Sequence, residues 1–134
     1  LEDLKAFVRR TRRDGRALGT VPWVRRALAD LEMRVEVGRQ LGLLNAWLID
    51  QGVVPTKEGS IAKIYVTELN ARLASVGLDI LGLAGQLAMD DPAAPLHGRL
   101  QWLYTIAPMQ RFGGGTNEIQ RCIIAQRGLG LPRK

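Results

Sequence analysis

Two long stretches of the chain repeat apolar residues at helical spacing, and they constrain the fold more than any other feature. In the first stretch, apolar or small residues recur every three or four positions, at Val24, Leu28, Leu31, Val35, Gly38 and Leu41. In the second, the same period runs through Ile61, Tyr65, Leu69, Leu73, Val76 and Ile80. This spacing gives each helix one apolar stripe. Two such helices, joined by a loop expected at residues 52–59, should pack antiparallel.

Shorter helices are expected at residues 4–13, 98–109 and 116–127, with Gly128 just beyond the last one. Ser60 is expected to cap the second long helix. No alternating strand pattern is present, so the sequence predicts an all-α fold, an up-down bundle of about four helices. The large aromatic residues are expected in the core or in interfaces: Trp23, Trp47, Trp102, Tyr65 and Tyr104.

Composition excludes several classes of protein. The chain has 134 residues, of which 46% are hydrophobic and 24% charged, as in an ordinary globular domain. No apolar run approaches the roughly 20 residues of a membrane span, and no signal peptide is evident, so a cytoplasmic location is expected. A single histidine and a single cysteine leave little for a metal site. Because Leu1 is not methionine, residues 1–134 are expected to be a fragment of a longer protein.

Arginine supplies much of the net charge of +6. Five arginines crowd one short segment: Arg9, Arg10, Arg12, Arg13 and Arg16. Such a cluster can face a phosphate-bearing ligand or simply form a solvated surface, and both interpretations stay open. Phe7 is the only aromatic residue nearby, so the segment does not favour a surface on which nucleic-acid bases stack.

A glycine-rich turn at residues 113–115 opens the last expected helix. Glycines without Cβ atoms let a ligand approach the backbone closely. Thr116 can cap the helix, and Glu118 in its first turn complements the helix dipole. A plain turn between two helices explains the same residues equally well.

The segment that contains this turn resembles the C-terminal signature of acyl-CoA dehydrogenases. Residues 114–133 read GGTNEIQRCIIAQRGLGLPR, close to the family's GT-x-[EQ]-IQR, IIA-x-R and LG-LP elements. Weaker likeness covers residues 29–36, 60–63 (SIAK) and 79–85. The resemblance implies the C-terminal helical domain of an FAD-dependent enzyme that desaturates the Cα–Cβ bond of an acyl-CoA thioester.

Site residues follow from the resemblance position by position. It implies that Thr116, Asn117 and Glu118 contact FAD and that Gly115 lies near the thioester of the acyl-CoA substrate. A second group is implied to reach the FAD of a neighbouring subunit: Asp79, Ile80, Leu81, Gly82 and Leu83. A cofactor gripped across a subunit interface implies a dimer or tetramer, either homo-oligomeric or built with related subunits.

The family's catalytic base is missing from this signature. Many members carry a glutamate directly before the GT pair, and Gly114 stands there in this chain. Because glycine cannot accept a proton, no catalytic residue is expected here and the chain alone is expected to be inactive. Three hypotheses stay open: an enzyme with its base upstream of Leu1, a non-catalytic partner subunit, and, less favoured, a basic helical nucleic-acid-binding module.

Overall fold

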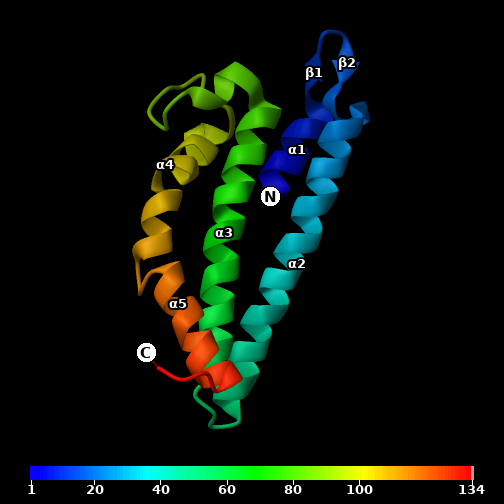
Figure 1. The fold of residues 1–134 in the computed structure, drawn as a ribbon. Helices are drawn as coiled ribbons and strands as arrows, with labels where there is room; N and C mark the ends of the chain where they lie inside the picture. The colour runs from blue at the N-terminus through cyan, green and yellow to red at the C-terminus, as the bar shows by residue number, and fades with distance from the viewer. Residues whose placement is uncertain (134) are drawn as a thin grey trace.

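The computed structural model describes residues 1–133 (Figure 1). α1 (Glu2–Arg10) runs toward one end of the molecule, α2 (Pro22–Asp50) runs the length of the molecule in the opposite direction, and α3 (Thr56–Leu81) returns beside α2. α4 (Arg99–Phe112) and α5 (Asn117–Ile123) together run back along α3. The predicted all-α, up-down four-helix architecture is confirmed, with the last segment divided in two by the glycine turn.

A short β-hairpin follows α1, where the sequence predicts a helix as far as residue 13. β1 (Arg12–Arg13) pairs antiparallel with β2 (Arg16–Ala17). Between them, Asp14 and Gly15 have positive φ angles of 52° and 75°. Asp-Gly is a favoured pair for such a two-residue hairpin loop. The predicted helix end and the predicted lack of strands are therefore wrong, and the Asp-Gly pair is the sequence signal that points to the hairpin.

α3 begins earlier than the sequence predicts. Its first residue is Thr56, so Gly59 and Ser60 lie inside the helix. The Ser60 hydroxyl is buried and donates to the carbonyl of Thr56 at 3.0 Å. The predicted Ser60 cap is therefore wrong. A serine whose hydroxyl donates to a carbonyl inside a helix cannot be told from a capping serine by sequence alone.

α4 continues past its predicted end at Met109 although Pro108 lies within it. Pro108 is exposed, so water can bond the carbonyl that the missing proline N–H leaves without a partner. A π-helical turn, η4 (Ile124–Gly128), extends α5. The positive φ beyond it belongs to Gly130, at 67°, and not to the predicted Gly128.

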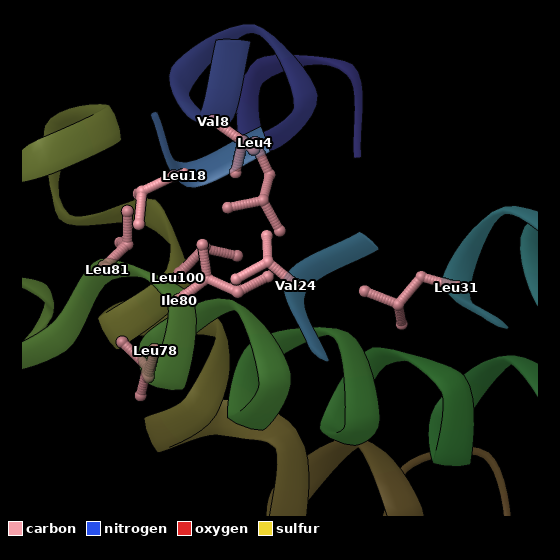
Figure 2. Packing of buried hydrophobic residues seen from close by; sticks show 9 residues of the cluster. All are labelled: Leu4, Val8, Leu18, Val24, Leu31, Leu78, Ile80, Leu81 and Leu100. Atoms are coloured by element: carbon pink, nitrogen blue, oxygen red, sulfur yellow. The ribbon is translucent and has the colours of Figure 1, made fainter. Parts of the chain in front are cut away.

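The buried core lies at the end of the molecule where α1, the start of α2, the end of α3 and the start of α4 meet (Figure 2). Three 3-10 turns connect the main elements: η1 (Leu18–Thr20) lies between β2 and α2, and η2 (Gly82–Gln86) and η3 (Pro95–Gly98) lie between α3 and α4. The core side chains are Leu4, Val8, Leu18, Val24, Leu31, Leu78, Ile80, Leu81 and Leu100. α2 contributes no buried side chain beyond Leu31, so the second half of this helix lies outside the core.

Four of the five large aromatic side chains lie outside this core. Trp23, Trp47, Trp102 and Tyr104 are each 43–57% exposed, so none of the four lies in the core, and their expected position in an interface stays a prediction. Tyr65 is partly buried, and its hydroxyl donates to the carbonyl of Arg34 at 3.1 Å.

Two further findings concern residues 1–133 as a whole. None of the helices in this range is long and apolar enough to span a bilayer. No group of three or more His, Cys, Asp or Glu side chains in it is arranged to hold a metal ion.

Candidate functional site

The glycine turn between α4 and α5 is built on backbone conformations that favour glycine. Gly114 and Gly115 have φ angles of 67° and 90°. Thr116 follows in an extended conformation, and its Oγ1 accepts the backbone N–H of Ile119 at 3.2 Å. The predicted Thr116 cap is confirmed, and it fixes the point at which α5 begins.

Gln120 locks this turn from within α5. Its side chain is 9% exposed, and Nε2 donates to the carbonyl of Gly114 at 3.0 Å. A Cβ atom on Gly115 would lie 2.8 Å from the same nitrogen. Sequence reasoning missed this role, although Gln120 belongs to the quoted IQR element.

Asn117 is turned into the bundle. Its side chain is 1% exposed, and its Oδ1 accepts Lys63 Nζ at 2.8 Å and Thr67 Oγ1 at 3.3 Å. Lys63 Nζ also donates to the carbonyl of Arg111 at 2.9 Å. One lysine of α3 thus ties together the end of α4 and the start of α5. Lys63 is the lysine of the SIAK segment, but its role was not predicted.

Charged side chains complete the contact between α5 and α3. Arg121 Nη2 lies 2.7 Å from Glu68 Oε1, and Arg111 approaches the same oxygen at 4.0 Å. Glu118 is exposed, and its pKa is lowered by hydrogen bonds from its own backbone N–H and from the Thr116 hydroxyl. Of the three residues expected at FAD, Thr116 and Glu118 present side chains to the surface, whereas the side chain of Asn117 does not.

The second expected group, Asp79–Leu83, lies at the C-terminal end of α3. Ile80 and Leu81 are 0% and 4% exposed and belong to the core, while Leu83 is 93% exposed. Asp79 is also exposed. Of these five residues, therefore, Asp79, Leu83 and the backbone around Gly82 are the ones that can meet a ligand.

One arginine of the basic cluster occupies this helix end. Arg13 Nη2 donates to the carbonyls of Ile80 and Leu81 at 2.9 and 3.0 Å. A cation at the C-terminus of a helix complements the helix dipole and satisfies free carbonyls. The hairpin therefore brings positive charge beside Asp79–Leu83. At least one member of the cluster has a structural role.

The two groups of expected site residues are not brought together within one chain. Asn117 contacts α3 at Thr67, and the stretch of α3 from Thr67 to Asp79 is about 18 Å long at 1.5 Å per residue. Figure 1 shows α5 and the end of α3 toward opposite ends of the molecule. Gly114, at the position of the family's glutamate, faces open space, since a Cβ atom there would meet nothing within 4 Å.

This arrangement of helices and turns defines a class of protein. A family model described as "Acyl-CoA dehydrogenase, C-terminal domain" matches residues 1–129. The chain belongs to the acyl-CoA dehydrogenase family, as its C-terminal signature predicts.

Particular relatives share this domain. The chain is 37% identical, over 117 residues, to acyl-CoA dehydrogenase FadE26 of Mycobacterium tuberculosis, covering 83% of this chain and 28% of the relative. It is similar to a chain of the ChsE4-ChsE5 complex from Mycobacterium tuberculosis, with a TM-score of 0.91, 31% identity and coverage of 99% and 35%. It is also similar to a chain of the Tcur3481-Tcur3483 steroid ACAD, with a TM-score of 0.90, 32% identity and coverage of 99% and 33%. The chain thus spans about a third of the proteins it matches.

Proposed function

We propose that this chain is the C-terminal helical domain of an FAD-dependent acyl-CoA dehydrogenase, which desaturates the Cα–Cβ bond of an acyl-CoA thioester with FAD bound across a subunit interface. The observation that carries the proposal is the capped glycine turn at Gly114–Thr116, which places an open backbone and two polar side chains at one surface. When bound, FAD supplies the acceptor for the hydride that leaves Cβ.

The residues at the glycine turn fit a contact with the flavin cofactor in part. Thr116, Glu118 and the backbone of Gly114 and Gly115 are accessible and would hold the cofactor at this turn. Asn117 would contribute through its backbone only, because its side chain is bonded to α3. Gly115 would leave room for the thioester beside the turn.

At the other end of α3, Asp79, Gly82 and Leu83 would meet the cofactor of a neighbouring subunit. Ile80 and Leu81 would support them from the core. A carboxylate such as Asp79 repels a pyrophosphate, and the adjacent Arg13 guanidinium reduces that repulsion. The separation along α3 supports the sharing of FAD between subunits, since the two groups of residues cannot contact the same part of one cofactor.

A non-catalytic partner subunit is the second candidate, and Gly114 favours it. Glycine provides no carboxylate to remove the α-proton, so catalysis needs a base from elsewhere in the protein. Two similar solved structures are described as pairings of two proteins, ChsE4 with ChsE5 and Tcur3481 with Tcur3483, which supports an assembly of related subunits.

The test is to purify the full-length protein, alone and with the product of its neighbouring gene, and to measure bound flavin. Bleaching of the flavin absorbance by acyl-CoA thioesters then reports desaturation. Steroid thioesters are the first to assay, because one similar structure is described as a steroid ACAD. A preparation that stays colourless after FAD is added would sink the flavin assignment. Bleaching only in the mixed assembly would favour the partner subunit.

The sharing of FAD across the subunit interface can be tested separately. Leu83→Glu and Thr116→Ala should each lower the flavin content, while Thr105→Ala, which removes an exposed hydroxyl of α4, should not. Mixing the two defective proteins should restore some flavin, because a mixed assembly contains one site in which neither contact is altered. No restoration on mixing would contradict a shared site.

A further inference from the structure

The peptide group between Gly114 and Gly115 is held on its carbonyl side by a buried side chain. The Gly114 carbonyl accepts Nε2 of Gln120 at 3.0 Å, and Gln120 is 9% exposed. No peptide bond in residues 1–133 is cis, so the C=O and N–H of this peptide point in opposite directions. The N–H of Gly115 therefore points away from Gln120, and no backbone carbonyl in residues 1–133 accepts it.

The two glycines do not select this orientation by themselves. Rotation of the peptide plane by half a turn would move the φ angle of Gly115 from 90° to about −90°, a value that ordinary residues adopt. Glycine populates positive and negative φ about equally, so the backbone resists such a flip only weakly. A flipped peptide would present the Gly114 carbonyl on the side where the Gly115 N–H now lies. The side chain of Gln120 therefore selects one of two orientations.

Gln120 is itself held in place by the packing of α5 on α3. Asn117 lies one turn earlier on the same face of α5. Its Oδ1 accepts Lys63 Nζ at 2.8 Å and Thr67 Oγ1 at 3.3 Å, both from α3. These bonds fix the rotation of α5 about its own axis, and with it the direction from which Gln120 reaches the turn.

We propose that Gln120 is a positioning residue of this site: by binding the Gly114 carbonyl, it turns the Gly115 N–H toward the carbonyl oxygen of a bound thioester. A site that donates a hydrogen bond to one ligand atom discriminates against an analogue that lacks this atom. The flipped peptide would instead bring two carbonyl oxygens together, and these repel each other. The inference rests on the proposed function, in which the thioester lies beside Gly115.

Binding of two ligands that differ in the carbonyl oxygen tests this role in the full-length protein with FAD added. One probe is the CoA thioester of an α,β-unsaturated steroid acid, because a similar structure is described as a steroid ACAD. The other is the matching thioether, in which a CH₂ group replaces the C=O group. A straight-chain pair is titrated in the same way, and calorimetry gives the Kd of each probe.

The unaltered protein should bind the thioester more tightly than the thioether. Gln120→Met keeps most of the side-chain volume but removes the donor, so it should lower this preference about fivefold. That factor corresponds to one hydrogen bond of about 1 kcal/mol. Gln120→Glu is a second variant, because its carboxylate cannot donate to the Gly114 carbonyl but can accept the Gly115 N–H of a flipped peptide. It should also remove the preference.

Gly77→Ala is the matched control. Its new Cβ would lie 2.5 Å from Leu100 Cδ1, so it strains the same domain at the other end of α4. A purely structural role of Gln120 would weaken both probes equally, as this control should, and would leave the preference unchanged. Circular dichroism and flavin content are measured on every sample.

The outcomes separate this inference from the proposed function. A preference that survives in the folded Gln120 variants, an equal loss of preference in Gly77→Ala, or no preference in the unaltered protein would overturn the role of Gln120 alone. An unaltered protein that binds no probe of either pair would overturn the proposed function and this inference with it.

Discussion

Replacement of Gly115 by alanine should destabilise the chain more than the same replacement at Gly114. At both positions alanine adopts a positive φ, which costs about 1 kcal/mol. At Gly115 the new Cβ would also lie 2.8 Å from Gln120 Nε2, whereas at Gly114 it would meet nothing within 4 Å. Moving the Gln120 amide breaks its bond to the Gly114 carbonyl, worth about 1 kcal/mol. We expect a loss of about 2 kcal/mol for Gly115→Ala and about 1 kcal/mol for Gly114→Ala.

Urea denaturation followed by circular dichroism measures both losses by linear extrapolation. Gln120→Ala provides a matched control, because it removes the atom that the new Cβ would strike. In that background Gly115→Ala should cost only its backbone strain, so a double-mutant cycle should show a coupling of about 1 kcal/mol. The reasoning is refuted if Gly115→Ala is no worse than Gly114→Ala, or if its effect is the same with and without Gln120.

Two other predictions concern the helices. Gly77→Ala should destabilise the protein by about 1–3 kcal/mol, because the new Cβ would lie 2.5 Å from Leu100 Cδ1. Gly42→Ala has open space around the new Cβ and should stabilise α2 by about 0.5–1 kcal/mol. Urea titrations in which Gly42→Ala is the less stable variant would contradict this. Hydrogen bonds from Arg39 and Gln40 lower the pKa of Glu36 from 4.5 to about 2. The stability that the charged carboxylate contributes is therefore present above about pH 4.5 and is lost as pH falls toward 2. The Glu36→Gln variant should lose less stability than the unaltered protein over that pH range. An NMR titration of the Glu36 carboxyl group with a midpoint near pH 4.5 would disprove the lowered pKa.

Local features of the chain were readable in the sequence because their causes lie within a few residues. The apolar period places α2 and α3, and Thr116 after the glycines places the start of α5. The hairpin was missed, but its signal, Asp14–Gly15, is equally local. Helix limits were less accurate, since Ser60 and Pro108 act differently inside a helix than at its end.

The candidate site was predicted as two groups of residues, but the orientation of their side chains was not. Nothing near Asn117 in the sequence indicates that it turns inward, because Lys63 and Thr67, which hold it there, belong to a different helix. Ile80 and Leu81 likewise fall in the core through contacts with α1 and α4. Their expected part in binding FAD stays a prediction, confined to the backbone and to their exposed neighbours.

The sequence by itself determined the family, the four-helix architecture and the absence of a glutamate at Gly114, since each depends on residue identity and local spacing. Only the tertiary structure decided that Arg13 closes the end of α3 and that Gln120 locks the glycine turn. It also decided that Met33, Val37, Leu44 and Trp47 of α2 are exposed in this chain. These depend on which surfaces meet when the helices pack, and a helical period shows that a stripe exists without showing what covers it.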